Sequence, residues 1–184
     1  KMHIKGKHNY ENACAAAALA VAAGVDKDAI SEGFCGFEGL PHRLEYVAEL
    51  DGVKFYNDSK STTAESVAVA VSAFPGGVHL IAGGRDKGCD FTVVNEYIRK
   101  HVSDICLIGE AADRMQGIWD GLAPINRAGT LHEAILKSLR CAASGDVVVF
   151  SPGCSSFDMF ISYEERGNVF KQLVRELVSE RAIS

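Results

Sequence analysis

The sequence of 184 residues lacks several features that would place a protein in a well-defined functional class. It has no excess of basic residues, because 19 Lys and Arg stand against 24 Asp and Glu, for a formal net charge of −5. A chain of this charge with scattered cations is not expected to bind nucleic acid. The apolar run at residues 13–24 is too short and too rich in alanine to span a membrane, and it lacks the layout of a cleavable signal. We therefore expect a soluble, cytoplasmic, monomeric protein that binds neither nucleic acid nor membranes.

The cysteines show no pattern of a metal site or a disulfide framework. Six are present, at positions 14, 35, 89, 106, 141 and 154, without a CxxC pair. Their neighbours are mostly apolar or small, which predicts reduced thiols that serve as small buried hydrophobic side chains. The sequence therefore predicts no cysteine nucleophile and no metal ligand.

Two common nucleotide-binding loops are also absent. No GxxxxGK[ST] phosphate-binding loop occurs, and GGRDKG at residues 83–88 has neither its spacing nor its Lys-Ser/Thr ending. No GxGxxG follows a predicted strand, which places a dinucleotide-dependent oxidoreductase well below other interpretations. The chain alone thus has no evident loop for the phosphates of ATP.

The pattern of residues predicts two parts. Residues 8–23 form an alanine-rich helix, and a second helix begins at Asp26, so the first part is a pair of helices. Turn-forming residues at 36–41 follow, and we place a domain boundary there, between residues 1–38 and 39–184. This segment is also our predicted hinge between domains.

The second part alternates between strands and helices. It opens with a hairpin that turns at Asp51-Gly52. Four further strands are expected at 77–83, 104–109, 123–126 and 146–152, and helices at 63–73, 91–100, from 111, at 130–143 and at 163–179. The strands are nearly continuous in apolar residues, which is typical of a sheet covered on both faces. The prediction is an α/β fold: a Rossmann-like, mostly parallel sheet with helices on both faces, preceded by a short helical segment.

Polar clusters follow three of the predicted parallel strands. In VKFYNDSKSTTAES, residues 53–66, the cluster Asp58 to Thr63 follows a strand; residues 85–87 and 151–158 follow two others. The carboxyl ends of parallel strands share one edge of the sheet, where ligands bind in open α/β folds. Lys60 and Lys87, with nearby hydroxyls and helix N-termini, suit a carboxylate or phosphate there.

Each of these residues also has a plainer interpretation. A single loop lysine is usually exposed to solvent. Thr62 and Ser156 fit equally well as helix N-caps. Asn9 and Asn12 lie three apart on one helix face and would suit a planar heterocycle, although capping or surface roles are more common. Arg43 suits either a phosphate or a surface ion pair. His42 is a weaker candidate for catalysis.

Five stretches carry a resemblance to a known family. They are GKHNYENACAAAALA, GLPHRLEYV, YNDSKSTTAES, GGRDKGCDF and SPGCSSFDMFISYEERGNVF, and in this order they resemble the Mur ligases, most closely the members that add D-glutamate. DSKST and the SPGCSSFD…YEERG block are the most diagnostic, and the DNPR motif of diaminopimelate-adding members is absent. The chain is similar to the tail of the central ATP-binding domain followed by the C-terminal domain.

The resemblance implies an ATP-dependent amide ligase of peptidoglycan precursor synthesis. Such an enzyme joins D-glutamate to UDP-N-acetylmuramoyl-L-alanine through an acyl phosphate. ATP and Mg²⁺ would be bound mainly by domains absent from this chain. Because the phosphate loop and the UDP-binding domain are missing and Lys1 falls within an element, we expect a truncated chain that is inactive alone. The alternative is a stand-alone module that binds a dicarboxylate or a nucleotide.

The resemblance also implies two sets of binding residues and no catalytic residue or metal ligand. Nucleotide contacts are implied for Asn9, Asn12, Arg43 and Asp58. A D-glutamate site is implied for Lys60, Thr62, Lys87, Ser156, Phe157 and Tyr163. The sequence departs from the family pattern at Thr63, where asparagine is common, and has Tyr163 where phenylalanine is also found; a tyrosine keeps the apolar ring and adds a hydroxyl.

Overall fold

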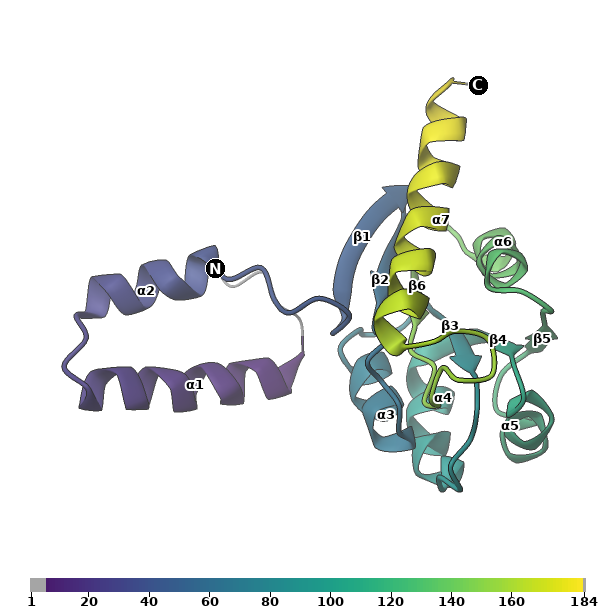
Figure 1. Ribbon diagram of the computed structural model, residues 1–184, viewed down its shortest axis with the longest axis horizontal. Helices are drawn as coiled ribbons and strands as arrows, with labels where there is room; N and C mark the ends of the chain where they lie inside the picture. The colour runs from purple at the N-terminus through teal and green to yellow at the C-terminus, as the bar shows by residue number, and fades with distance from the viewer. Residues whose placement is uncertain (1–5, 184) are drawn as a thin grey trace. The chain divides into compact units, whose positions relative to one another are not determined.

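The computed structural model describes residues 6–183, which form two compact units divided between Pro41 and His42 (Figure 1). The first unit holds helices α1 (Lys7–Ala22) and α2 (Lys27–Gly36), which contact each other. Asp26 caps α2, because its carboxylate accepts a hydrogen bond from the N–H of Asp28 at 2.8 Å. The second unit begins at residue 42, where the sequence suggested 39; the assignment of each part to a ligase domain remains a prediction.

A six-stranded sheet forms the centre of the second unit. Its order is β1-β2-β6-β3-β4-β5. β1 pairs antiparallel with β2, and every other pairing is parallel. The strands are β1 (Glu45–Leu50), β2 (Val53–Asn57), β3 (Val78–Gly83), β4 (Val102–Ile108), β5 (Ile125–Arg127) and β6 (Val147–Phe150). The predicted fold class is therefore confirmed, including the single antiparallel edge strand.

The turn between β1 and β2 follows from its two residues. Asp51 and Gly52 both adopt positive φ, 52° and 80°. Two successive residues of this kind form the hairpin turn whose twist matches that of the flanking strands, and Asp-Gly is a favoured pair for it. The turn fixes the register of the edge strand, with Leu50 opposite Val53.

Helices cover both faces of the sheet (Figure 1). On one face lie α3 (Ala64–Ser72), the 3₁₀ turn η1 (Phe91–Val94), α4 (Asn95–His101) and α5 (Ala112–Trp119). On the other lie α6 (Leu131–Cys141) and α7 (Tyr163–Ile183). Side chains alternate along each strand, so Leu80 packs into the first core and Ile81 into the second.

The helices differ in detail from the predicted ranges. The helix expected at 91–100 is split into η1 and α4, and Asp90 caps η1 by accepting from the N–H of Thr92 at 3.0 Å. α7 continues to Ile183 and is 21 residues long. No helix within residues 6–183 has both the length and the apolar character to cross a membrane.

The cysteines only partly follow their prediction as buried side chains. Cys106 and Cys154 are buried, and burial raises the pKa of each thiol to about 12, which makes them unreactive. Cys14, Cys35 and Cys141 are exposed, so the prediction is wrong for these three. Two of them, Cys14 and Cys35, lie on α1 and α2 of the first unit. None of the six forms a disulfide.

A buried charged network closes the amino-terminal edge of the sheet. His79 on β3 contacts Asp104 through Nδ1 and Asp146 through Nε2, the latter at 3.1 Å. Burial alone lowers the pKa of His79, but the hydrogen bonds to the two carboxylates outweigh it and raise the pKa. The pKa of Asp146 is lowered, because hydrogen bonds from the N–H of Ala143 and from His79 outweigh its burial. An imidazolium thus joins β3 to β4 and to the start of β6.

Replacing His79 is expected to destabilise the protein in a pH-dependent way. A histidine with a raised folded pKa contributes stability that is complete below pH 6.5 and lost as the pH rises through the folded value. His79→Gln should therefore lower the free energy of unfolding by about 3 kcal/mol at pH 6, since it leaves two carboxylates unpaired, and by less at pH 9. Urea titrations at both pH values measure this, with the exposed His132→Gln as control. A loss that is equal at both pH values would contradict the charged network.

Candidate functional site

The three polar loops of the second unit meet at the carboxyl edge of the sheet. They are residues 58–63 after β2, 84–90 after β3 and 151–162 after β6. The chain passes from β2 to β3 over the position of β6, which returns later to lie between them. Such a change in strand order opens a crevice at the carboxyl ends of the strands, the usual ligand site of open α/β sheets.

Hydrogen bonds join these loops into one surface. The hydroxyl of Ser151 donates to Asp58 at 2.8 Å, which links the loops after β6 and β2. Arg85 and Ser155 exchange backbone hydrogen bonds of 2.9 and 3.1 Å, and the hydroxyl of Ser155 also donates to the carbonyl of Arg85. The loop after β6 is therefore bonded to both of its neighbours, and the edge is rigid before any ligand binds.

Asp58 is a nearly buried carboxylate at this edge. Its two oxygen atoms accept from the N–H of Leu44 at 3.0 Å and from Ser151. Burial raises the pKa of Asp58 to about 7, although these hydrogen bonds and the charge of Arg43 act in the opposite direction. Near neutral pH the carboxyl group therefore exists in both protonation states. Arg43 itself is exposed, and no carboxylate within residues 6–183 forms an ion pair with it.

His42 is structural in this arrangement. It has φ of 62° and is 7% exposed, with its Nδ1 3.0 Å from the amide nitrogen of Asn57. Burial lowers its pKa, so the ring is neutral and accepts from Asn57. Glu45 accepts from the N–H of His42 and from Asn57, and it pairs with Lys171 at 3.1 Å. The network holds the backbone from which Arg43 projects.

Lys60 and Tyr163 come together from distant parts of the sequence. The ammonium group of Lys60 lies 5.5 Å from the centre of the Tyr163 ring, at the start of α7. The lysine remains exposed, which leaves its charge open to a ligand. Thr62 is half-buried, and Thr63 is the residue that caps α3, since it accepts from the N–H of Ser66. The N-cap interpretation of Thr62 is therefore wrong.

Lys87 lies in a loop whose backbone is fixed by its neighbour. Asp86 accepts from the N–H groups of Gly88 and Cys89 and forms an ion pair with Arg114. Lys87 is exposed, and no carboxylate in the described part of the chain forms an ion pair with it. Its charge is thus presented from an ordered loop next to the one that carries Ser155.

Ser156 and Phe157 lie in a tight turn of the loop after β6. The carbonyl of Ser156 accepts from the N–H groups of Met159 and Phe160 at 3.1 and 2.8 Å. Ser156 is buried, whereas Phe157 is 58% exposed. Ser162 accepts from the N–H of Glu165 in the first turn of α7, so Ser156 is not the cap of that helix.

The two asparagines of the predicted nucleotide set lie in the first unit. Asn9 is half-buried and Asn12 is exposed, both on α1. Of the ten predicted binding residues, the other eight lie in the second unit, in the three loops, at Arg43 and at the start of α7.

Arg166 is a residue of this edge that the sequence reasoning missed. It is 1% exposed on α7 and donates to groups in the loops after β2 and β6. A signal was present, because Arg166 falls on the apolar stripe of α7 with Phe170, Leu173 and Val174 at helical spacing. A charged residue on a buried stripe requires hydrogen-bond partners elsewhere in the fold.

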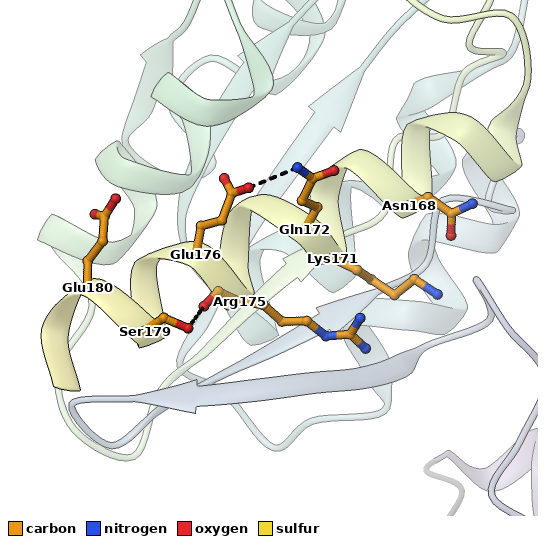
Figure 2. Close-up of a pocket in the computed structure, with 7 residues that line it drawn as sticks. All are labelled: Asn168, Lys171, Gln172, Arg175, Glu176, Ser179 and Glu180. Atoms are coloured by element: carbon orange, nitrogen blue, oxygen red, sulfur yellow. Dashed lines mark hydrogen bonds between the residues drawn. The ribbon is translucent and has the colours of Figure 1, made fainter. Parts of the chain in front are cut away.

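A separate depression runs along the outer side of α7 (Figure 2). All its lining residues belong to that one helix: Asn168, Lys171, Gln172, Arg175, Glu176, Ser179 and Glu180. Several bond to one another: Gln172 donates to Glu176 at 2.8 Å, and the hydroxyl of Ser179 donates to the carbonyl of Arg175. Lys171 is instead paired with Glu45 on β1. A surface lined by one helix, with several of its polar groups already bonded, is not the convergent site that the sheet edge provides.

Comparison with known proteins points to one family. Residues 42–154 match the family described as Mur ligase, glutamate ligase domain. The UDP-N-acetylmuramoylalanine–D-glutamate ligase of Acidobacterium capsulatum is 46% identical over 171 residues, which cover 93% of this chain and 37% of that protein. The enzyme of the same name from Chlorobium limicola is 42% identical, over 96% of this chain and 38% of that protein. The chain thus spans less than two-fifths of the length of these relatives.

Solved structures agree on the fold. The UDP-N-acetylmuramate–alanine ligase MurC of Thermotoga maritima has a TM-score of 0.69 at 15% identity, covering 95% of this chain and 39% of that one. The folylpolyglutamate synthase of Mycobacterium tuberculosis, complexed with ADP, has a TM-score of 0.67 at 14% identity, covering 92% and 41%. The family match begins at residue 42, where the second compact unit begins. On this evidence the chain belongs to the Mur ligase family.

Proposed function

We propose that this chain is the C-terminal part of an ATP-dependent ligase that adds D-glutamate to UDP-N-acetylmuramoyl-L-alanine. The identity to relatives of that name, over nearly the whole chain and less than two-fifths of their length, supports this proposal. In it, residues 1–38 are the tail of the central ATP-binding domain and residues 39–184 the C-terminal domain. The complete enzyme would act in the cytoplasm on peptidoglycan precursors.

The observation that carries the proposal is the charge at the sheet edge. D-glutamate has two carboxylates, and Lys60 and Lys87 present two exposed ammonium groups from the loops that flank the loop after β6. Hydroxyls of Thr62 and Ser156 and the rings of Phe157 and Tyr163 would complete the site. An ammonium group paired with a carboxylate is a strong, charge-assisted contact, so two cations favour a dicarboxylate over a neutral amino acid.

Arg43 and Asp58 form the nucleotide side in this proposal. The exposed guanidinium of Arg43 suits phosphate oxygen atoms, and Asp58 suits a hydroxyl of the nucleotide sugar. Asn9 and Asn12 would contribute from the central domain. In this proposal ATP and Mg²⁺ are bound mainly by domains of the complete enzyme that lie outside this chain.

These residues would act mainly by position and electrostatics. Phosphoryl transfer to the carboxylate of the first substrate yields an acyl phosphate, and the amine of D-glutamate attacks its carbonyl carbon with departure of phosphate. Fixing both carboxylates of D-glutamate orients the amine for attack, and loss of that orientation reduces the rate sharply. The segment at residues 36–41 would serve as the hinge by which the C-terminal domain closes over ATP.

A chimera tests the proposed function directly. This chain should restore D-glutamate-dependent phosphate release when it replaces the matching 171-residue segment of the Acidobacterium capsulatum ligase. The chain alone should release none, because it lacks a phosphate-binding loop. Phosphate is measured with ATP, Mg²⁺ and UDP-N-acetylmuramoyl-L-alanine, with and without D-glutamate. Turnover by the chain alone would refute the claim that essential parts of the ligase lie outside it. A folded chimera indifferent to D-glutamate would favour a separate binding module.

Lys87 is expected to control the affinity for D-glutamate. In the chimera, Lys87→Ala should raise KM for D-glutamate by roughly 10- to 100-fold, as for loss of a charge-assisted hydrogen bond, and leave KM for ATP nearly unchanged. Initial rates at varied D-glutamate and ATP measure both constants. Lys100→Ala, an exposed lysine on α4, is the matched control. A rise in both constants together would argue against a specific D-glutamate contact.

Asp58→Asn is expected to stabilise the chain more as the pH rises. Because burial raises the pKa of Asp58 from 3.8 to about 7, the stability gained from the neutral acid is complete below pH 3.8 and lost as the pH rises through 7. An amide stays neutral and can bond to Leu44 and Ser151 at every pH. The variant should gain at least roughly 1 kcal/mol between pH 4.5 and 8 relative to the wild type. Urea unfolding measures the gain, with the exposed Asp120→Asn as control. If the difference in unfolding free energy between variant and wild type were the same at every pH, the raised pKa of Asp58 would be refuted.

A further inference from the structure

Arg166 forms hydrogen bonds to two of the three loops of the site. Its Nε donates to the hydroxyl of Ser59 at 3.0 Å, and its Nη2 to the carbonyl of Ser59 at 2.8 Å. Both Nη atoms donate to the carbonyl of Cys154 at 3.1 Å. Ser59 belongs to the loop after β2 and Cys154 to the loop after β6, so one side chain of α7 joins both.

The partners of Arg166 are all uncharged. Its four hydrogen bonds go to one hydroxyl and two carbonyl oxygen atoms, and no carboxylate among residues 6–183 forms an ion pair with it. The guanidinium also lies 5.9 Å from the centre of the Phe150 ring. Burial lowers the pKa of Arg166 to about 10, so the group stays charged at neutral pH. Burying a cation is costly, and the charge of Asp158 offsets only part of that cost. The fixed fork of five donors on arginine is suited to bridging backbone carbonyls.

Each contact of Arg166 lies next to a residue of the proposed D-glutamate site. Ser59 precedes Lys60, and its hydroxyl also donates to the carbonyl of Tyr163 at 2.8 Å. Cys154 is two residues before Ser156. The guanidinium therefore fixes the backbone from which Lys60, Ser156 and Tyr163 project.

The third loop approaches the same guanidinium at a glycine. Gly84 has φ of 135°, and a Cβ atom built there would lie 3.2 Å from Nη1 of Arg166, besides clashing with the carbonyl of Ser155. The loop that carries Lys87 thus passes close to Arg166 only because residue 84 has no side chain. All three loops pack around one buried cation.

We propose that Arg166 is a positioning residue for D-glutamate: it touches no substrate, but it sets the spacing between Lys60, Ser156 and Tyr163 on which the two carboxylates of the substrate depend. This inference rests on the proposed function and deepens it. A residue that only supports the core would affect both substrates and the whole fold alike. Loss of a positioning residue weakens the binding of D-glutamate and loosens the two loops to which Arg166 is bonded.

The conservative variant Arg166→Lys separates these roles. Lysine keeps the charge and the stem but cannot reproduce the planar fork that reaches Ser59 and Cys154 together. In the chimera, KM for D-glutamate should rise about tenfold, the scale of a lost charged hydrogen bond, with KM for ATP within about twofold of wild type. Arg127→Lys, an exposed ion pair with Asp113 outside the site, is the matched control and should change neither constant. Equal rises in both constants, or no rise, would overturn the proposal.

Hydrogen exchange on the chain itself gives an independent measure. In Arg166→Lys, amides of residues 58–63 and 151–162 should exchange faster, while those of β3 and β4 keep their protection. Uniform loss of protection, or none in these loops, would overturn the positioning role. If the wild-type chimera has no D-glutamate-dependent activity, the proposed function fails, and exchange still decides whether Arg166 orders the loops. Arg166→Met, which removes every hydrogen-bond donor of the side chain, should increase the exchange rate of the same two loops further. If this variant does not fold, the exchange rates of Arg166→Lys still test the positioning role.

Discussion

The site depends on the insertion of β6 between β2 and β3. This pairing places three chain segments, which are far apart in sequence, at one edge of the sheet. The parallel pairing also sets the direction of every loop, because all three leave the sheet at their carboxyl ends. The apolar run of Val147 to Phe150 is buried on both faces, so β6 is held by the two cores. A strand with a polar face would not be stable in this central position.

The polar groups beneath the loops are organised at a cost to stability. Asp58 is kept nearly buried with a pKa near neutrality, and the hydrogen bonds of buried Arg166 all go to uncharged groups. Neither arrangement maximises the stability of the isolated domain, since burying a charge is unfavourable unless its hydrogen bonds compensate. The charged network of His79 at the opposite edge differs, because there each charge has a partner of opposite sign. Unpaired charge is thus concentrated at the edge proposed to bind substrates.

Much of the fold and part of the site could be predicted from sequence, for identifiable reasons. The strands were evident because apolar runs such as Val78 to Ala82 have few other interpretations. The Asp51-Gly52 turn was evident because its conformation depends on these two residues alone. The polar edge followed from parallel topology alone. The position of β6 between β2 and β3 was not predictable from any local pattern, because pairing order depends on contacts between distant segments.

Side-chain roles that depend on tertiary contacts were also out of reach. Nothing local distinguishes Thr62 from Thr63 as the cap of α3, since both are threonines before an apolar helix. The exposure of Cys14 could not be inferred from its alanine-rich neighbours, which also suit a helix that other protein surfaces cover. The role of Arg166 depends on two loops that meet only in the folded chain.

The distribution of charge across the edge suggests why the ligase would divide its substrates between domains. This chain presents exposed cations at Lys60 and Lys87 and one carboxylate of variable protonation, with no cluster of metal ligands among residues 6–183. Under the proposed function, this surface would hold the dicarboxylate, while cations and a metal of the other domains would neutralise most of the charge on the transferring phosphoryl group. The amino acid would then be held on one domain and the phosphates mainly on another. Reaction would require these domains to close, which would make amide formation conditional on both substrates being bound.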